Sequence, residues 1–251
     1  MEVHAHSHPS TGSGHRKKWT HYFWEFIMLF LAVFCGFLAE YQLEHKIEKE
    51  KSRQYILSFY EDLKKDTASF SSVIKSYEIK LNAFKDRESC YKSLSKNNKL
   101  DACLFPLTSN SESFTDLVYS EGTMQQLKNA GGLRLLAKNE ADSILLYDNL
   151  LRTYIKHETS GFQDIQNSIR SVMQSIINYD FLIHPDTSSA VPVLYTTNPE
   201  LINRYFILLE GYNTRCIWGL EDMKQIKIKA ISLIEYFKKN YHLSERTPLE
   251  K

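Results

Sequence analysis

The chain has 251 residues, of which 43% are hydrophobic and 24% charged, and its formal net charge is +1. This composition indicates a folded protein with one sizeable domain, and the near-neutral charge gives no reason to expect a nucleic-acid partner. Nine glycines and six prolines are few for this length, which favours long helices over a turn-rich β fold. Four cysteines without a C-x-x-C spacing exclude a dense disulfide framework and the usual zinc motifs.

Residues 1–18 are polar and rich in Ser, Gly and His, which predicts a disordered tail. Its histidines could collect a metal ion loosely, but no further ligands define a coordination geometry. No metal site is therefore expected there.

Residues 19–42 form the most apolar stretch, with aromatic side chains at both ends. About 20 helical residues cross the ~30 Å hydrocarbon core, and aromatic residues favour its interfaces. A cleaved export signal needs a small residue at the third-last position before the cut. Phe34 and Phe37 fill that position for cuts after Gly36 and Ala39. An uncleaved membrane anchor is expected, with a cleaved signal and a buried core helix as the alternatives.

Basic residues Arg16, Lys17 and Lys18 immediately precede this span, whereas those after it lie further away among acids. The positive-inside rule counts Lys and Arg close to a span. It favours a single-pass protein of the bacterial inner membrane, with a cytoplasmic N-terminus and a periplasmic C-terminal domain.

One face of the span carries the residues of a candidate association seam, namely Glu25, Leu29, Ala32, Gly36 and Ala39. Small residues let helix backbones approach closely, so this face could pair with a second copy or another membrane protein, although small residues are common in spans. Glu25 lies about one turn inside the membrane edge, where its carboxylate reaches headgroups and water. A protonated or partner-paired Glu25 is the alternative.

Residues 43–55 are strongly charged helix formers, which predicts a juxtamembrane stalk that continues the span. From Ile56 to Phe84 apolar residues recur every three or four positions, which predicts the buried stripe of a long helix. Glu61, Asp62 and Asp66 lie close together on it but alternate with lysines and lack an E-x-x-H partner. A solvated face is expected there, not a di-metal centre.

The polar stretch 93–110 predicts a loop. Cys90 and Cys103 flank its start; they would form a disulfide if the domain is exported, and would otherwise be two buried or half-buried thiols. A shorter helix is expected over residues 114–129, stopped by Ala130-Gly131-Gly132.

A second long helix is expected to begin near Asn139, a suitable N-cap, and to kink at Ser160-Gly161. Asp148 falls within its apolar stripe, at the bundle edge or paired with an arginine, with a ligand contact as the alternative. The arginines considered are Arg134, Arg152, Arg204 and Arg215. Residues 180–197 predict a loop with a short extended piece at Val191–Thr196.

Asn198-Pro199-Glu200 is a strong helix start, with a cap residue, a proline and an acid in the first turn. An apolar stripe continues to Tyr241, after Lys238 and Lys239, which suit a helix C-terminus. Residues 243–251 predict a flexible tail.

These patterns together predict an all-α protein, in which residues 56–242 form an antiparallel bundle of long amphipathic helices because none can bury its stripe alone. The chain has no phosphate loop, no G-x-S-x-G and no H-E-x-x-H, since Gly161 stands four residues after His157 in the pair His157-Glu158. No catalytic residue, enzymatic activity or cofactor is expected.

Three stretches carry a family resemblance: EFIMLFLAVFCGFLAEYQLEH, EKEKSRQYILSFYEDLKKDT and TMQQLKNAGGLRLL. With the run Asp62-Leu63-Lys64-Lys65-Asp66 and a mid-chain Leu-Lys-x-x-Gly turn, the chain resembles a family of small single-pass membrane proteins common in Bacteroidota. The resemblance spans most of the chain. It implies the membrane helix and the helical domain, and it brings no activity or functional residue.

Two functional hypotheses follow. The first is a non-catalytic, membrane-anchored helical protein that acts through protein interaction, as a scaffold, adaptor or subunit of a membrane complex. Its expected partners are the lipid bilayer and a second copy or another membrane protein. The second is an extracytoplasmic sensor or ligand-binding helical domain that signals through a partner.

Overall fold

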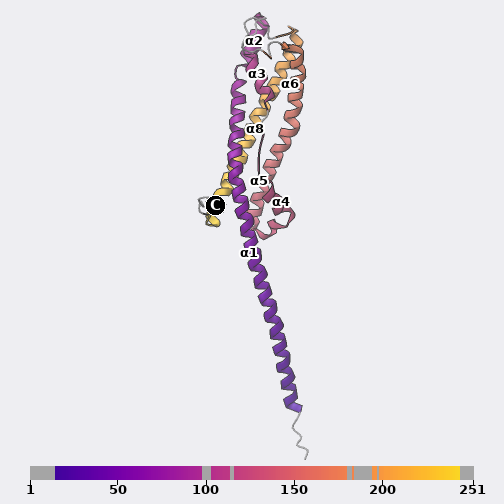
Figure 1. The fold of residues 1–251 in the computed structure, drawn as a ribbon, viewed down its shortest axis with the longest axis vertical. Helices are drawn as coiled ribbons and strands as arrows, with labels where there is room; N and C mark the ends of the chain where they lie inside the picture. Colours follow the sequence, from indigo (N-terminus) through magenta and orange to yellow (C-terminus); the bar gives the residue numbers. More distant parts are fainter. Residues whose placement is uncertain are drawn as a thin grey trace, which may run out of the picture. The chain divides into compact units, whose positions relative to one another are not determined.

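The computed structural model describes residues 15–97, 103–113, 116–179, 183, 194–196 and 198–243. Its helices are α1 (His15–Ala83), α2 (Arg87–Asn97), α3 (Leu104–Glu112), α4 (Gly122–Asn129), α5 (Lys138–His157), α6 (Gln163–Ile176) and α8 (Pro199–Asn240), with a 3-10 turn η1 (Gly132–Leu135) and a π-helical turn η2 (Glu158–Phe162) (Figure 1). No strand occurs among the described residues, in which Ile177 and Leu194 form an isolated antiparallel bridge. The predicted all-α fold is confirmed.

The chain divides into two compact units, Met1–Lys51 and Ser52–Lys251, here called the N-terminal unit and the bundle domain. In the described part of the chain, one helix is long and apolar enough to cross a membrane. Its most apolar 18-residue stretch has a mean hydropathy of 2.0, and none of those residues is buried by the protein.

Helix α1 begins at His15, inside the predicted disordered tail. The last residues of that tail are therefore helical, because Arg16, Lys17 and Lys18 are good helix formers that run directly into the apolar stretch. The rest of the predicted tail, residues 1–14, lies outside the described residues.

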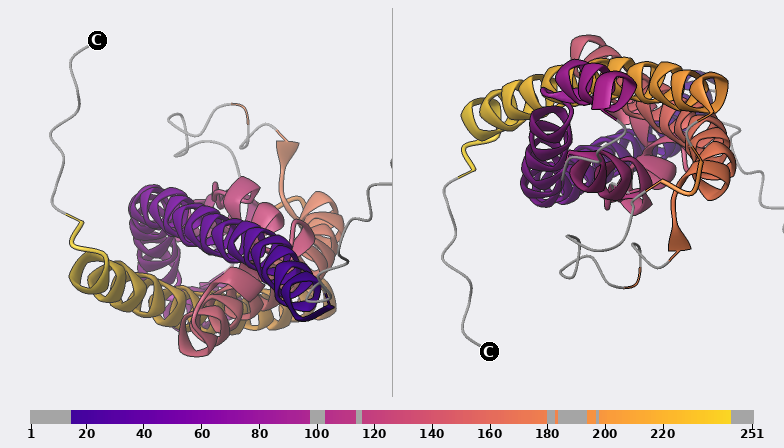
Figure 2. Two further views of the ribbon diagram at one scale, coloured as in Figure 1. Left: turned by 90° about the horizontal axis from the view of Figure 1, so that it is seen from below. Right: turned by 90° about the horizontal axis from the view of Figure 1, so that it is seen from above.

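Aromatic contacts fix the directions of the long helices in the bundle domain. Phe59 packs against Phe237 and Tyr147, with ring centroids 6.3 and 5.9 Å apart, and Phe84 packs against Tyr212 at 5.6 Å. Because α1 and α8 meet in reverse order, they are antiparallel. Helices α1 and α5 run in the same direction, since Asp66 contacts Tyr147 and Tyr77 contacts Tyr154. Figure 2 shows α1, α8 and the α5–α6 pair around a common interior.

The chain returns along the bundle between α1 and α5 through the described residues of 103–129, here called the return segment. Near its start Thr108 shares a hydrogen bond with Tyr205 of α8 (2.9 Å), and near its end Thr123 donates to Asp62 of α1 (2.5 Å). Consecutive elements are thus antiparallel, as predicted, and the fourth element is only partly helical.

Buried polar side chains hold the backbone of the return segment. Lys80 donates from Nζ to the carbonyl of Ser113 (2.9 Å), and Asp66 accepts from the backbone N–H of Ser120 (2.9 Å) and the hydroxyl of Tyr147 (3.1 Å). The solvated face predicted for the acidic cluster is therefore wrong for Asp66, which is 3% exposed. An extended segment against a helix needs acceptors for its N–H groups, and a carboxylate supplies one.

Two predicted boundaries on either side of this segment are wrong. Helix α2 extends to Asn97 and α3 begins at Leu104, both inside the predicted loop 93–110. The Cys90–Cys103 disulfide, with Cα atoms 5.8 Å apart, clamps α2 to the start of α3, which periodicity alone does not reveal. Within the predicted helix 114–129, residues 116–121 are not helical and α4 begins at Gly122, because Asp66 holds the N–H of Ser120 beside α1.

The ends of the later helices follow cap chemistry. Gly131 adopts a left-handed conformation (φ 70°), and the Asn198 side chain accepts from the N–H of Glu200 (2.9 Å), both as predicted. The N-cap of α5 is Ala137 and not Asn139, because the Glu140 carboxylate reaches back to the Ala137 N–H (3.3 Å).

The C-terminal end of α8 is closed by a Schellman arrangement. The Leu243 N–H donates to the carbonyl of Lys238 (3.1 Å), and His242 has a positive φ of 50°. Leu243 is 8% exposed, so the first residue of the predicted tail packs on the core, and residues 244–251 lie outside the described residues.

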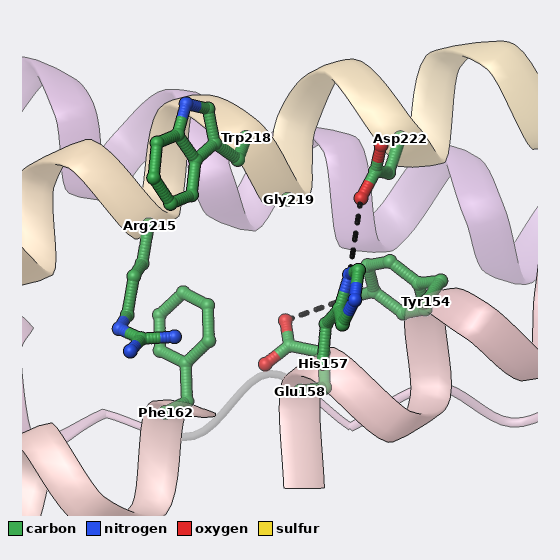
Figure 3. A pocket seen from close by; sticks show the side chains of 8 residues that line it. All are labelled: Tyr154, His157, Glu158, Phe162, Arg215, Trp218, Gly219 and Asp222. Atoms are coloured by element: carbon green, nitrogen blue, oxygen red, sulfur yellow. Dashed lines mark hydrogen bonds and ion pairs between the residues drawn. The ribbon is translucent and has the colours of Figure 1, made fainter. Parts of the chain in front are cut away.

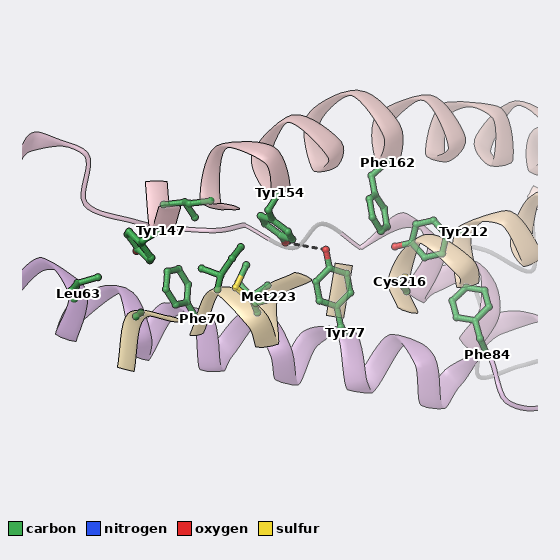
Figure 4. Close-up of a cluster of buried hydrophobic side chains, with 14 of the residues drawn as sticks. Leu63, Phe70, Tyr77, Phe84, Tyr147, Tyr154, Phe162, Tyr212, Cys216 and Met223 are labelled. Atoms are coloured by element: carbon green, nitrogen blue, oxygen red, sulfur yellow. Dashed lines mark hydrogen bonds between the residues drawn. The ribbon is translucent and has the colours of Figure 1, made fainter. Parts of the chain in front are cut away.

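The core of the bundle domain is a row of large aromatic side chains (Figure 4). The largest fully buried ones are Phe70, Tyr77, Phe84, Tyr205, Tyr212 and Phe237. The hydroxyls of Tyr77 and Tyr154 lie 3.0 Å apart, so these rings bring polar tips into the interior as hydrogen-bonded pairs.

Replacing Cys90 by serine should lower the stability of the bundle domain. The disulfide closes a sequence separation of 13 residues, and loops of roughly 15 residues contribute about 3 kcal/mol through the entropy of the unfolded chain. We expect the urea midpoint of Cys90→Ser to match that of the reduced wild type and to lie below that of the oxidised wild type. The exposed Cys35 supplies the control Cys35→Ser, and equal midpoints for the two variants would contradict the prediction.

Candidate functional site

The helix between Lys138 and Ile176 is interrupted by the π-helical turn η2, at the predicted Ser160-Gly161 position. Two hydroxyls compete locally for helix carbonyls: Thr159 donates to the carbonyl of Ile155 (2.9 Å) and Ser160 to that of Lys156 (2.7 Å). A π-helical turn inserts an extra residue into an α-helix and often marks a functional site. The surface beside η2 is therefore a candidate functional site.

A cavity of about 280 Å³ opens beside η2, between this turn and α8 (Figure 3). Its lining residues are Tyr154, His157, Glu158, Phe162, Arg215, Trp218, Gly219 and Asp222. The set combines aromatic surface, two carboxylates and one guanidinium, which is the composition of a small-molecule pocket and not of a simple packing gap.

Glu158 is a strongly perturbed group in this lining. Its carboxylate accepts a hydrogen bond from the Tyr154 hydroxyl (2.9 Å), yet burial raises its pKa from 4.5 to about 7. Because the Tyr154 hydroxyl donates its proton to Glu158, it can only accept from Tyr77, whose hydroxyl is therefore the donor in that pair. The carboxyl thus ends a chain of hydroxyls that begins in the core.

Two glycines make room for the side chains around the cavity. A Cβ on Gly161 would lie 2.1 Å from Nη1 of Arg215, and a Cβ on Gly219 would lie 2.5 Å from the Tyr77 hydroxyl. The absence of a side chain at each position lets the guanidinium lie against η2 and lets Tyr77 reach the wall of the site. Figure 3 shows Arg215 and Phe162 on one side of the cavity, and Glu158 and Asp222 on the other.

A second, smaller cavity of about 140 Å³ shares Glu158 and Phe162 with the first. Lys80, Ser113 and Gln166 line it, and Gln166 donates to the carbonyl of Ser111 (3.1 Å). Burial lowers the pKa of Lys80, whose ammonium lies 5.8 Å from the Tyr77 ring centroid. The return segment therefore forms the back wall of the region around Glu158.

Asp148, which the sequence placed within an apolar stripe, is fully paired. It is 6% exposed, accepts from Nε of Arg152 (3.0 Å), one of the four arginines considered, and forms an ion pair with Lys128. These contacts tie α4 to α5, so Asp148 has a structural role and does not lie at the cavity.

Sequence patterns singled out His157-Glu158 only as an incomplete zinc motif and did not identify the cavity. The available signal was a shared helical face: Arg215, Trp218, Gly219 and Asp222 are spaced i, i+3, i+4, i+7 on α8. A matching i, i+3, i+4 set consists of Tyr154 and His157 of α5 and Glu158, the first residue of η2. No group of three or more His, Cys, Asp or Glu side chains suited to a metal ion occurs in the described part of the chain.

The candidate association seam in the N-terminal unit keeps its predicted helical spacing. Glu25 pairs with His21 one turn earlier, with Nδ1 and Oε1 3.2 Å apart. A Cβ on Gly36 would meet no atom within 4 Å. The face formed by Glu25, Leu29, Ala32, Gly36 and Ala39 is open in the single chain, and its role in association stays a prediction.

Comparison with protein-family models, with curated proteins and with solved structures gave no match. The resemblance to the Bacteroidota membrane proteins therefore stays a prediction, and the site must be interpreted from its own chemistry.

Replacing Glu158 by glutamine should change how stability depends on pH. The raised pKa means that the folded chain protonates Glu158 below about pH 7, whereas the unfolded chain ionises it above 4.5. Glu158 therefore destabilises the fold increasingly as pH rises from 4.5 to about 7, by up to about 3 kcal/mol. Glu158→Gln should be the more stable protein at pH 8, by thermal unfolding, with the difference vanishing near pH 4.5.

The exposed Glu235 of α8 supplies a matched control. The Glu235→Gln protein should show the same dependence of stability on pH as the wild type. A Glu158→Gln protein with the same pH profile as wild type would contradict the assignment of this titration to Glu158.

Proposed function

We propose that this chain is a non-catalytic, single-pass membrane protein whose helical domain acts by binding other proteins, as a scaffold, adaptor or subunit of a membrane complex. The observation that carries the proposal is the apolar first part of α1, none of whose most apolar stretch is buried by the protein. The free energy of these exposed aromatic and aliphatic side chains is much lower in contact with the hydrocarbon core of a membrane than in contact with water.

The disulfide supports a location for the bundle domain outside the inner membrane. Cys90 and Cys103 are bonded, and such bonds persist in oxidising compartments such as the bacterial periplasm. Arg16, Lys17 and Lys18 precede the span, which favours a cytoplasmic N-terminus. The two arguments are independent and give the same orientation.

The buried thiol of Cys216 is not a candidate nucleophile. Burial raises the pKa of the Cys216 thiol to about 12, so it remains protonated and unreactive at neutral pH. Apolar side chains on α8, by contrast, are available to a protein partner: Ile217, Trp218 and Ile228 are 50%, 63% and 61% exposed.

The second candidate is a ligand-binding or sensor domain that signals through a partner. The specific observation in its favour is the cavity beside η2, which unites charged and aromatic side chains at a widened helical turn. The two candidates are compatible, because a domain that binds a small molecule can report it to a protein bound elsewhere.

Membrane topology can be tested with the full-length chain in a Gram-negative host. We expect the intact chain, with its own N-terminus, to remain in membranes after carbonate washing, because the apolar helix is an uncleaved anchor. Protease added outside spheroplasts should digest the bundle domain. Release by carbonate would overturn the anchor, and a domain protected until the membrane is permeabilised would overturn the orientation.

The association seam predicts a directional crosslinking pattern. In a Cys35→Ser background, Ala32→Cys and Gly36→Cys should form intermolecular disulfides in membranes more efficiently than Phe34→Cys and Leu38→Cys. The last two positions lie on the opposite helical face and serve as controls, since residues two positions apart point about 200° apart around a helix. Equal yields from the two faces would argue against the seam.

A further inference from the structure

We infer that the cavity beside η2 binds a small zwitterion of the amino-acid class, with the ligand's carboxylate at Arg215 and its ammonium at Glu158 and Asp222. This inference goes beyond protein binding and uses the bundle domain alone. A negative result in the topology test leaves it standing, and its own failure leaves the anchored scaffold standing.

The anionic end of the ligand is assigned by Arg215. Among the described residues its guanidinium has no ion-pair or hydrogen-bond partner, although it is only partly exposed. It is held at one side of the cavity, against Gly161, where a Cβ would lie 2.1 Å from Nη1. A planar, partly desolvated guanidinium presents paired donors that match a carboxylate.

The cationic end is assigned by the two carboxylates across the cavity (Figure 3). Glu158 accepts a hydrogen bond from Tyr154 (2.9 Å), and Asp222 lies 4.0 Å from Nδ1 of His157. No lysine or arginine forms an ion pair with either carboxylate in the part of the chain that the structure describes. An ammonium placed between them would gain two charge-assisted hydrogen bonds.

The walls set the size and character of the rest of the ligand. Phe162 and Trp218 give the cavity apolar surface, and Gly219 keeps α8 from filling it. The volume of about 280 Å³ suits a molecule of amino-acid size, since pockets for larger drug-sized ligands begin at about 300 Å³. An apolar side chain, such as that of leucine or phenylalanine, fits against the two rings.

The mixture of charges distinguishes a zwitterion from simpler ligands. A lone amine would satisfy the carboxylates but leave Arg215 without an anion and repel it. A lone carboxylic acid would satisfy Arg215 but face two carboxylates of its own sign. A ligand that carries both charges places an opposite charge on each side of the cavity.

The first experiment uses the full-length chain, oxidised and in detergent micelles, and isothermal titration calorimetry at neutral pH. The probes are L-leucine and L-phenylalanine, with 4-methylpentanoate and 3-methylbutylamine as analogues of leucine that lack the ammonium or the carboxylate. We expect at least one of the two amino acids to bind. Each analogue should bind at least about tenfold more weakly than leucine, a loss of about 1.4 kcal/mol. Binding of neither amino acid at about 10 mM, or equal binding of an analogue, would overturn the inference.

The second experiment separates a binding role from a structural one. In Gly161→Ala the new methyl group takes the place of Nη1 of Arg215 and must push aside the far end of a flexible side chain, which perturbs the fold little. We expect an unchanged melting temperature and about a tenfold or larger loss of amino-acid affinity, as for Arg215→Gln. Arg204, an exposed arginine on the same helix, provides the control Arg204→Gln, which should bind as wild type does. Normal binding by Gly161→Ala and Arg215→Gln would show that the guanidinium does not hold the ligand.

Discussion

The bundle domain depends on the satisfaction of backbone hydrogen bonds along one non-helical stretch. Helices satisfy their own N–H and C=O groups, but Ser113 and residues 116–121 of the return segment are not helical, and they pack against helices that offer no backbone partners. Its groups are met by buried side chains instead: Lys80 and Gln166 both donate to the carbonyl of Ser113, and Asp66 accepts from the N–H of Ser120. An unpaired buried backbone group would cost about 1–3 kcal/mol, so these polar residues specify the path of the segment.

The same polar contacts shape the candidate site. Lys80 and Gln166 reach the return segment from α1 and α6, and between them they form one wall of the cavity behind Glu158. Burial lowers the pKa of Lys80 and raises that of Glu158, so each charge is disfavoured by the environment that positions it. The candidate site therefore uses groups that the fold has already desolvated.

Much of the helical fold could be predicted because it follows local rules. The cap at Asn198 and the left-handed Gly131 depend on residues adjacent in sequence, and the apolar stripe of α8 repeats through the whole helix. The burial of Asp66 could not be predicted, because its partner Ser120 is 54 positions away and lies in a segment with no periodicity. Residue type alone gave the wrong interpretation, because an aspartate among lysines is usually solvated. Here Asp66 is the one of the three acids that is buried, and it accepts a hydrogen bond from the backbone N–H of Ser120.

The site was hidden for a related reason. His157-Glu158 resembles part of a metal motif, and the residues that give it meaning, Arg215 and Asp222, belong to another helix. Two features were local: the hydroxyls and the glycine of Thr159-Ser160-Gly161, which predict an interrupted helix but not its π-helical form. Which side chains face that turn depends on the register of α5 against α8, and that register is set by distant contacts such as the hydrogen bond from Tyr236 of α8 to Glu140 of α5 (3.4 Å).

The hydroxyl chain that ends at Glu158 links the site to the core in a direction that depends on charge. While Glu158 is a carboxylate, Tyr154 must donate to it and Tyr77 must donate to Tyr154. A protonated Glu158 can donate to Tyr154 instead, which frees the Tyr154 proton for Tyr77 and reverses the chain. An ammonium beside Glu158 favours the carboxylate and so fixes one orientation. The Tyr77 hydroxyl lies against Gly219 of α8, so the chain of hydroxyls that begins at Glu158 ends at the contact between α1 and α8, two of the long helices that form the core.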